Sequence, residues 1–266
     1  MQPTVSSHLP WWRLTLPREH GAWVQLAVAL LAGLRVARRP GPACGIAVAV
    51  VLLFLAREPL AVALGHRSRR RQLAEGPLRR WQAAGLAATA GVIGIAVLVL
   101  QGAALFEPHV IQQLVVAGLI GGASVWTVWT NRDRTPSGEV VAACAVASLG
   151  AVVAVVGGAA PLVAQMLLFA WSGAFALDTL AVHAAKIRML SAAPPLWARH
   201  AWLPLLVVTG VSGLGLLGQG GPAPAATLWL VGGAGALGAA VVRRPRHLLA
   251  VGVALAAVCV LALFLW

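Results

Sequence analysis

The amino-acid sequence predicts an all-α integral membrane protein. Of its 266 residues, 60% are hydrophobic and only 10% are charged, whereas soluble domains carry about 25% charged residues. The mean hydropathy is correspondingly high, at +0.86. The apolar residues form runs of the length that a helix needs to cross the hydrocarbon core of a bilayer, about 20 residues. These runs do not alternate with a period of two, so a transmembrane β-barrel is excluded.

Nine apolar runs predict nine transmembrane helices. The breaks between them are rich in proline, glycine and arginine, as in RRPGP, GPLRR and SAAPP, and such residues interrupt regular structure. No cleavable signal peptide is expected, because no small-residue cleavage site follows the first run. Residues 1–20 are therefore predicted to be a cytoplasmic N-terminal segment, and residues 21–266 a single transmembrane domain. The predicted spans are residues 21–37, 42–64, 81–105, 108–130, 138–158, 161–182, 199–218, 224–242 and 247–265.

The distribution of basic residues predicts the orientation of the chain. The N-terminal segment and the even-numbered loops hold 17 of the 20 lysines and arginines, and cytoplasmic loops carry the excess of such residues. The N-terminus is therefore expected in the cytoplasm of a multi-pass protein of the cell inner membrane, with the C-terminus outside. The first loop is the exception, because it holds Arg35, Arg38 and Arg39. The net charge of +13 does not indicate a nucleic-acid partner, since the arginines lie in short loops between apolar runs.

Two patterns that can mark functional sites are not interpreted as sites here. Cys44, Cys144 and Cys259 lie in apolar runs without CxxC spacing, so neither a disulfide framework nor a zinc site is indicated. They are expected to be small buried packing residues. GLGLLG at residues 213–218 and GAGALG at residues 233–238 match GxGxxG, but both lie in apolar spans rather than between a strand and a helix. Their glycines are expected to allow close helix packing.

Four polar groups lie at the predicted cytoplasmic ends of spans, in LPREHGAWVQL, in AREP, in SGEV and in ALDTLAVHAAKIR. Arginine alone would orient the protein, but carboxylates are not needed for that. An ionisable residue inside the membrane costs at least ~2.5 kcal/mol, so it is expected to be paired or to line a polar cavity. The candidate catalytic residues are His20, Glu58, Glu139 and His183, and the candidate substrate-binding residues are Arg18, Glu19, Trp23, Arg57, Asp178, Lys186 and Arg188.

The motif PREHGAW in front of the first span resembles the signature of the YwiC-like family of bacterial membrane proteins. AREP, SGEV and HAAKIR follow in an order similar to that family. The resemblance implies a multi-pass membrane protein and no particular activity.

A more distant resemblance is to the UbiA superfamily of intramembrane prenyltransferases. It is carried by nine spans, an inside N-terminus and polar stretches after spans two and six, and by NRDRTPSGEVVAACAVASLGA after span four. The resemblance implies a UbiA-like helical bundle with aspartate-rich motifs that hold Mg²⁺ on a diphosphate. This chain has one acid at each of those places, Glu58 and Asp178, which is too few for such a site. No metal site and no cofactor are therefore predicted.

These observations lead to the hypothesis of a cytoplasm-facing polar cavity that receives the headgroup of an anionic lipid or isoprenoid. Guanidinium groups bind phosphate or carboxylate without a metal, and Glu and His could transfer protons. Gly21 is expected to let a neighbouring helix come close, with Trp23 packing beneath the cluster. Two alternatives remain open: a transporter of a small anion or of protons, and a non-catalytic membrane scaffold. The cavity is expected to be lined by Arg18, His20, Arg57, Glu58, Glu139, His183 and Arg188.

Overall fold

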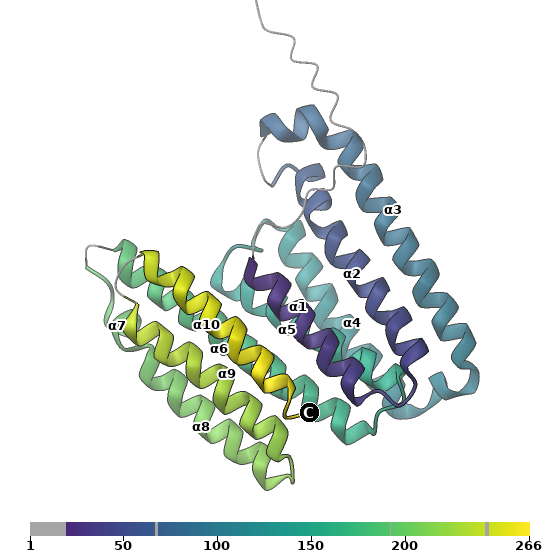
Figure 1. Ribbon diagram of the computed structural model, residues 1–266. Helices are drawn as coiled ribbons and strands as arrows, with labels where there is room; N and C mark the ends of the chain where they lie inside the picture. The colour runs from purple at the N-terminus through teal and green to yellow at the C-terminus, as the bar shows by residue number, and fades with distance from the viewer. Residues whose placement is uncertain (1–19, 67–68, 192, 243–244) are drawn as a thin grey trace, which may run out of the picture. The chain divides into compact units, whose positions relative to one another are not determined.

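The computed structural model describes residues 20–66, 69–191, 193–242 and 245–266. Every regular element in these ranges is helical, as the sequence predicts (Figure 1). Arg18 and Glu19 lie outside the described residues, as does the side chain of His20. The elements are α1 (His20–Val36), α2 (Pro40–Ala63), α3 (Arg69–Gln101), the short 3-10 helix η1 (Gly102–Phe106), α4 (Pro108–Trp129), α5 (Pro136–Val156), α6 (Pro161–Leu190), α7 (Leu196–His200), α8 (Trp202–Gly218), α9 (Pro222–Val241) and α10 (Pro245–Leu263).

Six of the described helices are long and apolar enough to cross a membrane. They are α2, residues 75–101 of α3, α4, α5, α6 and α9. The chain is therefore a multi-pass membrane protein. The other three predicted spans correspond to α1, α8 and α10, whose apolar stretches are only 10–17 residues long. A total of nine membrane crossings thus remains a prediction.

Two helices extend beyond the predicted spans. The stretch GPLRR was expected to be a break before residue 81, but α3 already begins at Arg69 and includes it. The Arg79 guanidinium lies 2.7 Å from the Glu75 carboxylate one turn earlier and donates to Gln82 at 2.5 Å. Such pairs three and four residues apart stabilise a helix. Likewise α6 continues to Leu190 rather than ending at residue 182, so its polar residues lie on the helix itself.

The chain divides into two compact units. Of the described residues, the first unit comprises those within 48–95, and the second those within 20–47 and 96–266. In the first unit the last turns of α2 are buried, including Phe54, Ala61 and Val62. Most of the described helices belong to the second unit, as do Glu139 and His183, whose side chains meet between two helices.

In the second unit α6 is the central helix. It packs against α5 and α9, and α9 packs in turn against α8 and α10 (Figure 1). On the other side α5 packs against α1 and α4. Trp171 and Phe175 of α6 are fully buried, and their ring centroids lie 5.3 Å apart. Around this aromatic pair the core consists largely of alanine, which lets the helices approach closely.

The backbones of α1 and α5 approach each other closely. A Cβ atom on Gly150 would clash with the carbonyl oxygen of Ala29, and one on Gly33 would clash with the carbonyl oxygen of Gly150. Small residues at such a crossing are typical of packed membrane helices. The expectation for Gly21 was wrong, because a Cβ at that position meets nothing among the described residues within 4 Å. The close contact of α1, at Ala29 and Gly33, lies about two to three turns further along the helix.

Several glycines of the two GxGxxG matches are packing residues, as expected. A Cβ on Gly213 would clash with the indole of Trp229, and one on Gly235 would clash with the carboxyl group of Asp178. The expectation that the cysteines are small buried packing residues is confirmed in full only for Cys259, which is buried. Cys144 is half-buried, and Cys44 is exposed.

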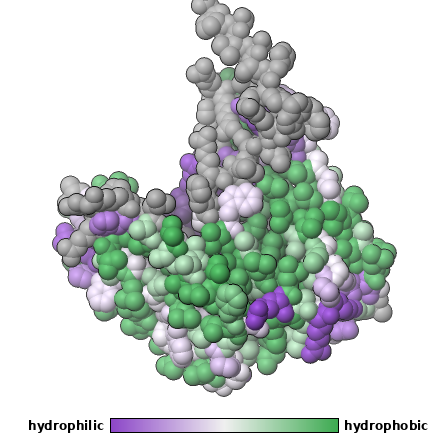
Figure 2. Space-filling model, in the orientation of Figure 1, coloured by the Kyte–Doolittle hydropathy of each residue, from purple (hydrophilic) through white to green (hydrophobic). Residues whose placement is uncertain are grey.

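Large apolar side chains cover much of the outer surface of the helices, as a lipid-facing protein requires. Val99 and Leu100 of α3 are 72% and 85% exposed, and Leu119 of α4 is 70% exposed. Figure 2 shows hydrophobic side chains over much of the visible face. Soluble proteins rarely expose apolar patches of this extent, so these faces fit contact with lipid tails.

Candidate functional site

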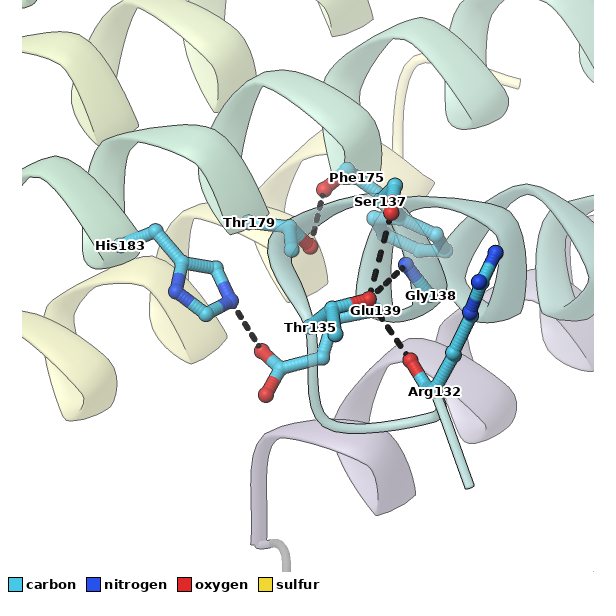
Figure 3. A network of polar contacts seen from close by, with 8 residues as sticks. All are labelled: Arg132, Thr135, Ser137, Gly138, Glu139, Phe175, Thr179 and His183. Carbon is cyan, nitrogen blue, oxygen red and sulfur yellow. Dashed lines mark hydrogen bonds and ion pairs between the residues drawn. The ribbon is translucent and has the colours of Figure 1, made fainter. Parts of the chain in front are cut away.

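The polar residues of the second unit are organised by the tight start of α5. The Thr135 hydroxyl accepts a hydrogen bond from the backbone N–H of Gly138 at 3.1 Å and donates to the Arg132 carbonyl at 2.7 Å (Figure 3). Thr135 is thus the N-cap residue of the helix, followed by proline at the first helical position, which is a favourable combination. Gly138 must be glycine, because a Cβ there would clash with the Arg132 carbonyl.

Glu139 of α5 and His183 of α6 form a direct contact between the two helices. The Glu139 carboxylate oxygen lies 2.8 Å from Nε2 of His183, across 44 residues of sequence. Figure 3 shows the two side chains pointing toward one another. A capping box would place its acid three residues after the cap, where this chain has Gly138. Glu139 comes one residue later and reaches α6 instead, while its charge lies in the first turn of α5, where the helix dipole favours an anion.

Arg188, five residues further along α6, is bound to backbone oxygens. Its guanidinium donates to the carbonyls of Ala239 and Val242 at the end of α9. The last carbonyls of a helix have no partner within the helix, so Arg188 caps α9. Lys186, on the same stretch of α6, is half-buried.

Asp178 is the most deeply buried of the predicted site residues that the structure describes. Its side chain lies on α6 against Gly235 of α9, and the residue is only 7% exposed. Within the described part of the chain, Oδ1 has no hydrogen-bond partner. The same holds for Nε1 of Trp171, two turns earlier on the same face of α6. A buried polar group without a partner is costly, so two such atoms on one apolar face of α6 are unusual.

The remaining predicted residues lie elsewhere. Arg57 and Glu58 belong to the first unit, where both are half-buried and take part in interactions. Trp23 is half-buried in α1. The structure thus brings Glu139 together with His183. A shared cavity that also includes the other predicted residues remains a prediction.

Three residues of structural importance were not singled out from the sequence, and for a fourth, the packing glycine Gly235, the partner was not foreseen. Thr135 and Gly138 shape the start of α5, and Gly235 makes room for Asp178. Thr135 could have been recognised from the sequence, because a Thr-Pro pair before an apolar run is a helix-start signal. Arg79 was counted only for topology, although it is 2% exposed and paired with an acid. Nothing in the sequence indicates that residue 235 faces residue 178.

The helices and the Glu139–His183 contact define a multi-pass α-helical membrane protein with ionisable groups among its helices. A family model described as YwiC-like protein matches residues 16–155, which is more than half of the 266 residues. The chain belongs to the YwiC-like family. The matched stretch contains PREHGAW, AREP and SGEV but ends before α6, so Asp178 and His183 lie outside it. No curated protein and no solved structure matches the chain.

Proposed function

We propose that this protein is a proton-coupled membrane transporter in which α6 carries the proton-binding groups. The observation that carries the proposal is the buried Asp178 carboxyl group with an oxygen that no described residue bonds. Ionisable residues inside membrane helices mark ion pathways and proton relays in many transporters. Among the alternatives open from the sequence, this geometry favours the transporter.

The surroundings of Asp178 suit a group that alternates between a charged and a neutral form. Leu177 and Ala181 of α6 are buried beside it, and Gly235 of α9 faces it. An unpaired carboxylate in such a place is expensive, whereas the protonated carboxyl is neutral and costs far less. Protonation of Asp178 would therefore change the energetics of the contact between α6 and α9, which is what a proton-driven conformational change requires.

The Glu139–His183 pair is a second site that can bind a proton, and it is more exposed to water than Asp178 is. The His183 side chain is 13% exposed and that of Glu139 is 34% exposed. Five residues separate Asp178 from His183, an axial rise of about 7.5 Å along an α-helix. Because the two residues are also about 140° apart around the helix, a chain of several water molecules would have to connect them. Protons would thus enter or leave through the hydrogen-bonded pair and bind at Asp178.

The test uses purified protein, and Asp178→Asn is compared with Thr209→Val. Thr209 is a buried polar residue of α8 whose hydroxyl donates to the carbonyl of Leu205 in its own helix, so its replacement is a matched, non-titratable control. Infrared difference spectra between two pH values should contain a protonated-carboxyl component in the wild type and the control that Asp178→Asn lacks, which assigns that component to Asp178. In proteoliposomes with an internal pH dye, phosphate, nitrate or succinate should drive proton uptake, and Asp178→Asn should reduce it at least tenfold. Identical spectra for all three proteins, or no proton uptake with any of the anions, would overturn the proposal.

The second candidate is a divergent UbiA-like transferase or a protein that binds a lipid or isoprenoid headgroup. The observation that favours it is the direct hydrogen bond between the Glu139 carboxylate and the His183 imidazole, an arrangement suited to acid–base catalysis. Against it, Arg188 donates to carbonyls of α9, which leaves fewer cations for a headgroup. Incubation with isoprenoid diphosphates and Glu139→Gln as the inactive control would reveal product only if this candidate holds.

A further inference from the structure

A pocket lies at the end of the second unit remote from the Glu139–His183 pair. Its volume is about 320 Å³, and it is bordered by the connections α1–α2, η1–α4 and α5–α6. Val155 in the last turn of α5 lines it, and Val155 is 16 residues beyond Glu139, about 24 Å along the helix. The pocket and the pair are therefore separate sites. The lining residues that can bind a ligand by hydrogen bonds or charge are Arg38, Arg39, Gln101, Glu107 and His109.

Hydrogen bonds from three segments hold the arginines of this pocket in place. The backbone N–H groups of Arg38 and Arg39 donate to the Gly157 carbonyl at 2.8 and 2.7 Å. Nη1 of Arg39 donates to the side-chain oxygen of Gln101 at 2.8 Å. The Gln101 amide in turn donates to the carbonyl of Val156 at 2.7 Å. The loop and one guanidinium group are thus positioned before any ligand arrives.

Gly158, which lines the pocket, has a backbone conformation that favours glycine. Its φ of +77° is in the left-handed region, which favours glycine. A Cβ at this position would lie 2.9 Å from Nε of Arg39. Glycine therefore allows both the turn after α5 and the close approach of the Arg39 side chain.

The balance of charge around the pocket is positive. Arg38 is exposed, and within the described residues its guanidinium makes no hydrogen bond or ion pair. Two arginines face one carboxylate, that of Glu107, which lies 3.4 Å from Nε2 of His109. The N-termini of α4 and α6 also border the pocket, and neither has a side-chain cap. Uncapped N–H groups and the positive end of the helix dipole favour an anion.

We infer that this pocket binds a phosphate group, either as a free ion or as the headgroup of a lipid. Guanidinium groups bind phosphate oxygens bidentately, and the pocket offers two of them. The inference also explains the exception in the arginine distribution. Arg38 and Arg39 lie in the one loop that departs from the predicted orientation, and anion binding gives them a reason to be there other than topology. This site does not depend on proton transport.

The experiment is isothermal titration of the purified protein in maltoside detergent, which carries no phosphate. One arm uses inorganic phosphate, and the other uses a soluble short-chain phosphatidic acid. Arg38→Gln with Arg39→Gln should weaken binding at least tenfold in the arm that binds. Arg35→Gln is the matched control, because Arg35 lies in the same region but over the ring of Phe264, 6.0 Å from its centroid, and does not line the pocket. Its affinity should stay within twofold of the wild type.

Each outcome decides the inference. Binding of phosphate alone identifies a site for the free ion, and binding of the phosphatidic acid alone identifies a headgroup site. Gly158→Ala, which changes no charge, should weaken binding severalfold because it displaces Arg39. The inference is wrong if neither probe binds, or if the double variant binds as tightly as Arg35→Gln. Infrared spectra of the double variant should retain the Asp178 band, so a failure here is distinguishable from a failure of the transport proposal.

Discussion

Gly235 of α9 makes room for the carboxyl group of Asp178 on α6, because a Cβ at position 235 would clash with Oδ1. The two residues are 57 positions apart and belong to helices that pack along their length. The absence of one side chain on α9 thus permits a buried acid on α6. This relationship leads to the first prediction.

Gly235→Ala should destabilise the protein by about 1–3 kcal/mol, because the added methyl group overpacks the contact between α6 and α9. Gly233→Ala on the same helix is the control, since nothing among the described residues lies within 4 Å of a Cβ there. That variant should be neutral or gain up to about 1 kcal/mol from helix propensity. Thermal unfolding in detergent measures both. Equal stability of the two variants would mean that Asp178 does not occupy the space beside Gly235.

Replacement of Glu139 and His183 should reveal an energetic coupling between α5 and α6. The side chains are 2.8 Å apart and partly exposed, so a hydrogen bond to a charged group here is expected to contribute about 1 kcal/mol. The measurement is a double-mutant cycle of Glu139→Gln, His183→Gln and the double variant, by unfolding in denaturant. The second replacement should cost less once the first is made. Strictly additive effects would contradict a direct interaction.

The helices could be predicted from the sequence because apolar runs of about 20 residues have a direct physical meaning in a bilayer. Their ends were less predictable. In α3 the arginines that resemble a loop lie within the helix, where the pairing of Arg79 with Glu75 supports it. The family could be predicted because PREHGAW is a local motif, which needs no knowledge of the fold.

The site could be predicted only in part, because its contacts are long-range. Glu139 and His183 were both expected to be functional, but their pairing depends on how α5 packs on α6. Arg188 was expected to bind substrate, and only the position of the last turn of α9 assigns its guanidinium to two carbonyls. The pocket at the opposite end combines three connections distant in sequence, and no single motif reveals such a combination.

Gly150→Ala should destabilise the contact between α1 and α5 by about 1–3 kcal/mol, since the new methyl group would meet the backbone of Ala29 and a backbone cannot move aside as a flexible side chain can. Gly121→Ala in α4 is the matched control, because a Cβ there meets no described residue within 4 Å. A fall in the midpoint of thermal unfolding is expected for Gly150→Ala alone. If both variants unfold at the wild-type temperature, the two helices do not cross at Gly150.

Arg188→Met should lower the free energy of unfolding by about 1–2 kcal/mol, because two carbonyls at the end of α9 lose their hydrogen bonds and a buried acceptor without a partner is costly. Methionine preserves much of the length of the side chain, so lost packing contributes little. Arg132→Met is the control: Arg132 is exposed in the turn before α5, the change in charge is the same, and surface substitutions usually stay within about 0.5 kcal/mol. Denaturant unfolding of both variants measures the difference.

Because the sequence alone suggested that Arg188 binds a substrate, the result also separates two roles of its guanidinium group. Unchanged stability of Arg188→Met together with lost binding of an anionic headgroup would show that its guanidinium serves a ligand rather than the end of α9.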